Sequence, residues 1–238
     1  MGKRLRRLLW TGGTILVVVA APWAVVPELL PGILEWYRPE IVYRGDRHRK
    51  VIYVTIDDSP TSGTEKILAV LAKHRVPATF FVISGRIRSG ADLRSIVEAG
   101  HSLGNHLRTT KACSRLGWDE FKADFDEADH ALRRVSAVRF FRPPSGFCTV
   151  QQAQFARSRG CTPLLGTVYP LDALIQNKAA LELLVRWLKI RGGILIMHDG
   201  DARAATTAAV LDEMIPELRR KGFAFASLQE LNPGQPSR

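Results

Sequence analysis

The sequence predicts an α/β fold built on parallel strands, either an open sheet or a barrel. Short apolar runs recur from residue 51 onward, and stretches with helical periodicity separate them. This alternation is typical of parallel sheets, because each crossover helix returns the chain to the same edge. The chain has 238 residues, of which 46% are hydrophobic and 24% are charged. That composition fits a large globular domain and excludes a wholly disordered or collagen-like chain.

The individual elements follow from these runs. We expect seven strands, at 51–55, 79–83, 102–105, 138–141, 163–167, 193–197 and 223–226. We expect helices between them, at 63–74, 90–99, 118–134, 149–159, 178–190 and 205–221. In the third helix, Phe121, Phe125, Ala128 and Leu132 recur at intervals of three and four residues, which places them on one face. Chemistry is then expected at the carboxyl ends of the strands.

An apolar segment near the N-terminus predicts a membrane anchor. Residues 3–7 carry four basic side chains, and the run at 8–27 that follows is uncharged. A helix of that length spans about 30 Å of hydrocarbon, and the preceding basic residues predict a cytoplasmic N-terminus. The alternative is a cleaved secretory signal. Pro22 directly follows the small residues at which cleavage would occur, and this favours an uncleaved anchor in the cytoplasmic membrane.

The predicted organisation is a basic cytoplasmic tail and anchor at 1–30, a linker at 31–50, an extracytoplasmic domain at 51–232 and a tail at 233–238. Trp36 and Tyr37 of the linker are predicted to lie at the membrane interface, or in an ordinary packed loop. The net charge of +11 suits anionic lipid, anionic glycans or nucleic acid. Nucleic acid is not expected as a partner, because no zinc-finger or recognition-helix signature accompanies the charge.

Three cysteines form an odd set without a C-x-x-C pair. They are Cys113, Cys148 and Cys161. One disulfide with a free thiol, or three buried small apolar residues, would each account for them.

Polar side chains follow five of the predicted strands. They are Asp57 and Asp58 after the first, His106 after the third, Arg142 after the fourth, Asp172 a few residues after the fifth, and His198 after the sixth. Each one alone is consistent with a turn or a cap. Their joint occurrence at successive strand ends is the inventory of a metal-assisted hydrolase.

The residue types suit hydrolysis of an amide. That reaction requires an activated water, a stabilised oxyanion and a proton for the departing nitrogen. A bound divalent ion lowers the pKa of water toward about 7. A cation such as Arg142 keeps a neighbouring carboxylate ionised as a base, and a carboxylate such as Asp172 keeps an imidazole protonated as an acid.

Four ordered segments resemble the motifs of the polysaccharide deacetylases (carbohydrate esterase family four, the NodB-homology domain). They are Thr55–Asp58, Gly104–His106, Arg142–Gly146 and Ile194–Asp199. Residues 78–82 match a further stretch typical of that family, and the resemblance spans roughly 51–231. It implies an irregular seven-stranded β/α barrel. It also implies a hydrolase of carbon–nitrogen (non-peptide) bonds that removes acetyl groups from N-acetylated or O-acetylated sugars of a polysaccharide or oligosaccharide.

The resemblance also implies a role for each matching residue. Asp57 matches the general base, Arg142 its partner, and His198 the general acid, with Asp172 near the position of the acid that tunes it. Asp58 and His106 match ligands of a divalent metal, zinc being the expected ion. Ser145 stands where a tyrosine is common and would offer its backbone N–H to the oxyanion. Ile196 would line the pocket for the acetyl methyl group.

One position departs from the family pattern. Thr110 stands four residues after His106, where the pattern has a second metal histidine. Catalytic zinc usually has three protein ligands and a water, so this loss weakens the site. Three explanations are open: another side chain completes the site, the ion is held weakly, or the domain has lost turnover and acts as a glycan-binding or interaction module. The tryptophan usual after the fifth-strand aspartate is also missing, since Ala173 follows Asp172.

Overall fold

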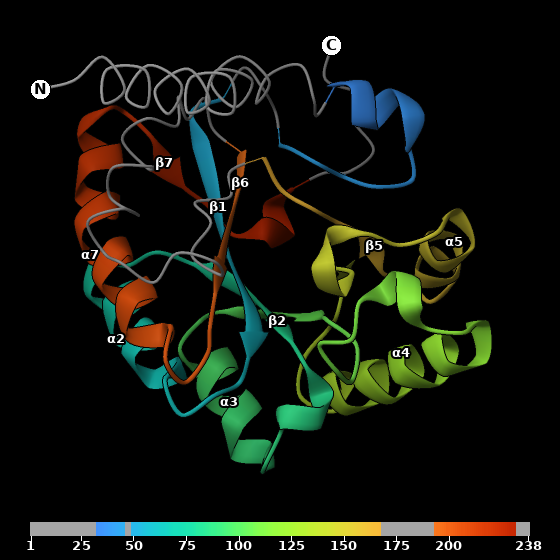
Figure 1. The fold of residues 1–238 in the computed structure, drawn as a ribbon. Coiled ribbons are helices and arrows are strands. Elements are labelled where there is room, and N and C mark those ends of the chain that lie inside the picture. Colours follow the sequence, from blue (N-terminus) through green and yellow to red (C-terminus); the bar gives the residue numbers. More distant parts are fainter. Residues whose placement is uncertain (1–31, 46–48, 168–192, 232–238) are drawn as a thin grey trace, which may run out of the picture.

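Parallel strands form one curled sheet in the computed structural model, in the order β5-β4-β3-β2-β1-β6, and β7 pairs with the start of β1 (Figure 1). The strands are β1 (Val51–Ser59), β2 (Ala78–Val82), β3 (Ser102–Asn105), β4 (Phe140–Phe141), β5 (Thr162–Pro163), β6 (Gly193–His198) and β7 (Ala224–Phe225). All seven predicted strands are present, and β4, β5 and β7 are shorter than predicted. The first strand is longer: β1 continues to Ser59, so the expectation that Asp57 and Asp58 follow it is wrong, and both lie within its last residues.

Helices flank this sheet on both sides (Figure 1). They are α2 (Thr64–His74), α3 (Gly90–Glu98), α4 (Trp118–Arg133), α5 (Val150–Ser158) and α7 (Ala204–Arg220). Each agrees with its predicted range to within one residue at either end. Helices α2 and α7 pack against each other, and α4 packs against β3 and α5. The start of α5 is fixed by a capping box, in which Thr149 and Gln152 each accept the other's backbone N–H.

The structure describes residues 32–45, 49–167 and 193–231. The predicted anchor at 1–30, the predicted helix at 178–190, the tail at 233–238 and Asp172 lie outside these ranges. Among the helices of the described ranges, none combines the length and the apolar character that crossing a membrane requires.

Strand β1 is an inner strand of the sheet, paired with β2 on one side and with β6 on the other. Both faces of β1 are buried. Ile52, Val54 and Ile56 pack in a core cluster that includes residues of α2 and α7, whereas Val51 and Tyr53 pack inside the curled sheet against residues of other strands. Because β1 has a neighbouring strand on each side and the sheet is curled, polar groups at its carboxyl end lie close to the ends of other strands.

The two edges of the curled sheet approach each other beyond β5. The backbone N–H of Thr167 donates to the carbonyl of Ile194 in β6 (3.1 Å). Gly166 permits this approach, because a Cβ there would lie 2.6 Å from Cγ1 of Ile196. The described strands therefore form a curled half-barrel whose open side is partly spanned by the segment after β5.

Helix α4 anchors an aromatic cluster under the sheet. Phe121, Phe125, Ala128 and Leu132 are fully buried, as their spacing predicts. The ring of Phe125 lies 5.3 Å from that of Phe141 in β4, edge to face. All three cysteines are buried free thiols, which confirms the alternative of three buried small residues.

Candidate active site

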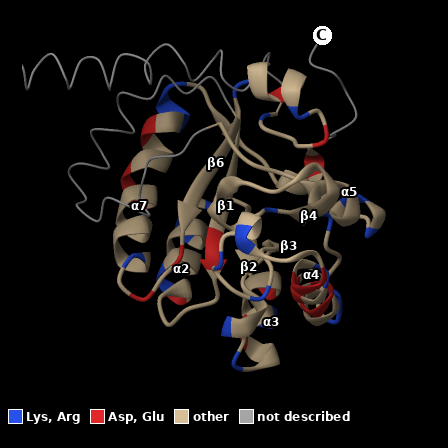
Figure 2. Cartoon of the chain, turned by 45° about the vertical axis from the view of Figure 1, so that its right-hand side comes forward, with Lys and Arg blue, Asp and Glu red and all other residues tan. Residues whose placement is uncertain are grey.

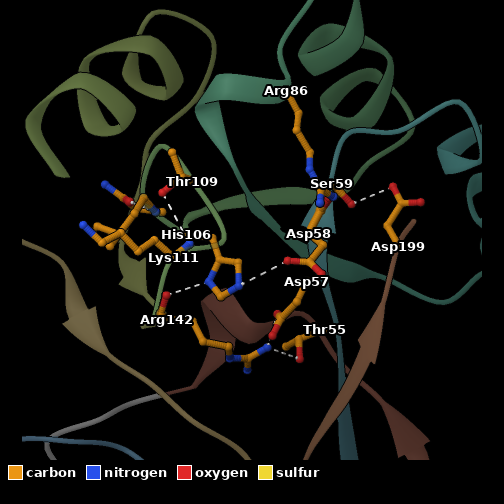
Figure 3. A network of polar contacts seen from close by, with 12 residues as sticks. Thr55, Asp57, Asp58, Ser59, Arg86, His106, Thr109, Lys111, Arg142 and Asp199 are labelled. Atoms are coloured by element: carbon orange, nitrogen blue, oxygen red, sulfur yellow. Dashed lines mark hydrogen bonds and ion pairs between the residues drawn. The ribbon is translucent and has the colours of Figure 1, made fainter. Parts of the chain in front are cut away.

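Four of the sequence-predicted side chains meet at the carboxyl edge of the sheet (Figure 3). Asp57 and Asp58 end β1, His106 follows β3, and Arg142 follows β4. A fifth, His198, ends β6 and pairs with Asp57 in the strand register. Carboxyl ends of parallel strands are where α/β folds place ligands, and here five strand-end residues converge.

The two aspartates owe their placement to an irregularity in β1. The pairing with β2 shifts register between Ile56 and Ser59, and Asp58 has a left-handed backbone (φ 68°). Consecutive side chains of a regular strand point to opposite faces. The irregularity re-aims them, so that both carboxylates face the same end of the sheet (Figure 3).

Arg142 and Asp57 form a buried ion pair. Nη1 of Arg142 donates to Oδ1 of Asp57 (2.6 Å), and the two residues are 1% and 4% exposed. The same Nη1 donates to the hydroxyl of Thr55 (2.7 Å), and the guanidinium lies 4.1 Å from the centre of the Phe81 ring. Nε and Nη2 donate to the carbonyls of Leu164 and Leu165. Arg142 is thus held on every side and cannot turn away from Asp57.

This surrounding charge keeps Asp57 ionised. Burial acts most strongly and opposes ionisation, but the positive charge of Arg142 and its hydrogen bond to Asp57 outweigh it. The pKa of Asp57 consequently lies below the ordinary value for an aspartate. A carboxylate that is buried and yet ionised is suited to accept a proton from water.

His106 is oriented so that one ring nitrogen faces Asp58. Its Nδ1 donates to the carbonyl of Arg142 (2.6 Å), which leaves the Nε2 lone pair 3.7 Å from Oδ1 of Asp58. The preceding Asn105 fixes this loop: its side-chain oxygen accepts from the N–H of Leu107, and its amide donates to the carbonyl of Phe125. A carbonyl partner on one ring nitrogen is the arrangement by which proteins orient a metal-binding imidazole.

The described residues supply two ligands for a divalent ion at this place. Two lone pairs that face each other across 3.7 Å fit a cation held between them. Within the described ranges, however, no group of three or more His, Cys, Asp or Glu side chains could hold a metal ion. Thr110 is exposed, and no other described side chain takes the place of the missing imidazole. The fit therefore extends to two protein ligands, Asp58 and His106.

Arginine side chains surround Asp58 on its other side. Nη2 of Arg203, just before α7, donates to Oδ2 of Asp58 (3.1 Å). Arg86, in the turn after β2, donates to the backbone carbonyl of Asp58 (Figure 3). A guanidinium on Oδ2 competes with a metal ion for the same carboxylate.

For the other sequence-predicted residues, the structure gives less detail about their place relative to this site. Ser145 is exposed and has a left-handed backbone (φ 64°) in the turn Pro144–Gly146 after Arg142. Ile196 is half-buried in β6, against Gly166. The structure gives no position for Asp172, because that residue lies outside the described ranges.

Sequence reasoning missed several residues that shape the site. Asp199, fully buried, accepts from the hydroxyls of Ser59, Thr61 and Thr64 and so fixes the loop after β1. The sequence placed Asp199 next to His198 at the end of the sixth strand, inside a motif, but assigned it no role. Arg86 and Arg203 stand in no motif, and their contact with Asp58 arises only from the fold.

Comparison with known proteins agrees with this geometry. The family model described as polysaccharide deacetylase matches residues 44–164. A chitooligosaccharide deacetylase of Sinorhizobium fredii is 32% identical over 194 residues, which cover 75% of this chain and 90% of that protein.

Solved structures show the same fold. A CE4 family pseudoenzyme from Bacillus anthracis is 27% identical, with a TM-score of 0.73 over 80% of this chain and 68% of that one. A mutant of the same protein is described as having restored enzymatic activity. A family 4 acetyl xylan esterase from Clostridium thermocellum, in complex with a cobalt ion, is 24% identical, with a TM-score of 0.67 over 76% of this chain and 89% of that one.

Proposed function

Since this chain belongs to the polysaccharide deacetylase family, we propose that it is a hydrolase that removes acetyl groups from N-acetylated or O-acetylated sugars of a polysaccharide or oligosaccharide. The observation that carries the proposal is the buried pair of Asp57 and Arg142. Burying two charges costs free energy. A chain with no use for an ionised carboxylate at this edge would lose little stability if apolar residues replaced the pair.

The reaction needs a base and an acid, and the site offers both. Asp57 accepts a proton from the attacking water, and the resulting hydroxide adds to the acetyl carbonyl carbon. The bond from that carbon to the sugar nitrogen or oxygen then breaks, and His198 in its protonated form donates the proton that the leaving atom requires. Acetate and the free amine or hydroxyl are the products. Arg142 holds Asp57 in place and in its ionised form.

Asp58 and His106 would hold a divalent metal ion in this proposal, with water or substrate oxygens at its other positions. When bound, such an ion polarises the acetyl carbonyl and lowers the pKa of water. Zinc is the expected ion. A two-residue site binds it more weakly than the usual three-residue site.

A second function is favoured by the ion pair between Arg203 and Asp58 (3.1 Å). That contact supplies a permanent counter-charge to Asp58, as expected where a metal ion is no longer used. The solved structure of a pseudoenzyme with the same fold shows that such chains exist in this family. In this alternative the domain binds a glycan or a partner without turning it over.

Metal content and acetate release distinguish the two functions. The full chain, purified in detergent and incubated with zinc, is assayed for bound metal and for acetate released from chitooligosaccharides. The same assays follow Asp58→Ala, with Asp119→Ala as the matched control on an exposed carboxylate (91% exposed). We expect bound zinc and acetate release that Asp58→Ala abolishes and Asp119→Ala retains. Absence of both from the unmodified chain would overturn the hydrolase proposal in favour of the binding module.

The location of the domain is part of the proposal. The basic residues and the apolar run at 1–30 would anchor the chain in the cytoplasmic membrane, with the domain on the extracytoplasmic side. Support comes from Ile33, Trp36 and Tyr37, which are 60%, 84% and 71% exposed just after that run. Side chains of this kind suit the headgroup region of a bilayer. Added protease should digest the domain in intact spheroplasts, and protection from it would contradict this orientation.

A further inference from the structure

An open cavity of about 750 Å³ lies next to the candidate active site. The loop after β1, the turn after β2 and the residues before α7 form its walls. Three of its lining residues are arginines, Arg86, Arg88 and Arg203, and one is an aspartate, Asp201. Two of these arginines, Arg86 and Arg203, also contact Asp58, so the cavity lies beside the expected metal ligand Asp58.

Arg86 carries the least compensated charge among the arginines of this cavity. No carboxylate forms an ion pair with Arg86 in the described part of the chain, and its one hydrogen bond goes to a backbone carbonyl. Arg88 is 70% exposed and forms an ion pair with Asp92 at 3.9 Å, a distance too long for a hydrogen bond. Arg203 uses one nitrogen on Asp58. Each guanidinium therefore keeps N–H groups for a further acceptor.

Asp201, the one carboxylate among the described residues that line the cavity, is hydrogen-bonded to Ser62 and stays ionised, so it offsets part of the arginines' charge. Asp201 accepts the backbone N–H of Ser62 (3.1 Å) and its hydroxyl (2.7 Å). These hydrogen bonds, more than the nearby arginines, lower the pKa of Asp201. Helix α7 also begins at this wall, and its first turn carries no acidic residue, so the positive end of its dipole adds to the arginines.

We propose that this cavity binds an oxyanion, a phosphate or a carboxylate, that the substrate carries beside its acetylated sugar. The inference rests on the proposed function and names its substrate class, an anionic rather than a neutral glycan. Guanidinium groups present paired N–H donors that match both oxyanions. Because Arg86 and Arg203 also contact Asp58, we expect the anion to lie on the substrate near its acetylated sugar.

Inorganic phosphate tests the site without any turnover. Calorimetric titration of the full chain in detergent, at low ionic strength, should show saturable binding of phosphate. Arg86→Gln should weaken it about tenfold, the usual effect of losing a charge-assisted hydrogen bond. Arg88→Gln should weaken it by a smaller factor, and this exposed side chain can be changed without disturbing the fold.

The matched control is Arg94→Gln, which removes the same charge from an exposed position on α3 outside the cavity. Its affinity for phosphate should equal that of the unmodified chain. No saturable binding, or an equal loss in Arg94→Gln, would overturn the proposal, because the effect would then reflect the overall charge of the chain.

Acetate release from different substrates shows whether the anion on the substrate is a phosphate or a carboxylate. Chitooligosaccharides that are neutral, phosphorylated or carboxylated are compared by kcat/KM. We expect the preferred source to exceed the neutral glycan at least tenfold, and Arg86→Gln to reduce that advantage. Phosphate binding without acetate from any substrate would refute the hydrolase proposal and leave the oxyanion site standing. Equal cleavage of all three, without phosphate binding, would refute the oxyanion site and leave the hydrolase.

Discussion

Replacing Arg142 with methionine removes the guanidinium that pairs with buried Asp57. In the native chain this pair is joined by a hydrogen bond of 2.6 Å, and Asp57 is only 4% exposed. Removing one partner of a buried ion pair typically costs about 3–5 kcal/mol, because the other charge stays buried without compensation. Methionine fills much of the vacated volume, so most of this loss is electrostatic. We expect Arg142→Met to lower the free energy of unfolding by that amount near pH 7.

The loss should depend on pH, with a sign set by the pKa of Asp57. In the native chain that pKa is held below the unfolded value, so Asp57 stabilises the fold above the unfolded pKa, and this contribution disappears as the pH falls through the folded pKa. Without Arg142, burial raises the pKa of Asp57 above the unfolded value. The charged carboxylate then destabilises the fold at neutral pH, and protonation relieves this as the pH falls. The deficit should shrink by up to about 1.4 kcal/mol for each pH unit below the raised pKa.

Urea unfolding of the full chain, followed by tryptophan fluorescence between neutral and mildly acidic pH, measures this deficit. Arg139→Met is the matched control, since Arg139 is exposed and stands just before β4. It should change the free energy of unfolding by less than about 0.5 kcal/mol at every pH. The double variant Asp57→Asn with Arg142→Met should lose the pH dependence. A deficit that is constant across this pH range would refute the reasoning.

Three further perturbations test other parts of the structure. Gly166→Ala should lower the free energy of unfolding by about 1–3 kcal/mol, seen as a lower Tm, because the new Cβ would lie 2.6 Å from Ile196; an unchanged Tm would contradict the close approach. Thr110→His should add a third protein ligand and so raise zinc affinity by about tenfold or more in calorimetric titration. The neighbouring control, Thr109→His, should leave zinc affinity unchanged. Burial lowers the pKa of His101 to about 4, so the unfolded chain takes up its proton first, and up to about 3 kcal/mol of stability should be lost as the pH falls from about 6.5 toward 4. His101→Gln should remove that part of the pH dependence in acid titrations of stability.

The order and type of the secondary-structure elements could be predicted because local patterns determine them. The spacing of Phe121, Phe125, Ala128 and Leu132 indicated α4, and all four are buried as expected. Strand ends were predicted less well. Nothing in the sequence distinguishes Thr55 from Ser59 as the end of β1, because pairing with β2 and β6 decides how far a strand extends.

The candidate site was partly predictable for a related reason. Residues at successive strand ends converge in any parallel sheet. The proximity of Asp57, His106 and Arg142 could therefore be predicted, although their distances could not. The direction of each side chain was not predictable. The left-handed backbone of Asp58 and the carbonyl that orients His106 depend on contacts between segments far apart in the chain.

The alternation of strands and helices, the family and the strand-end groups can be predicted from the amino-acid sequence, because they follow from periodicity and from motifs of a few adjacent residues. The pairing of Arg203 with Asp58, and the grouping of Arg86 and Arg88 with it around one cavity, depend on how the chain folds. These arginines lie in the turn after β2 and just before α7, more than a hundred residues apart. No local pattern records which distant side chains the curled sheet brings to one edge.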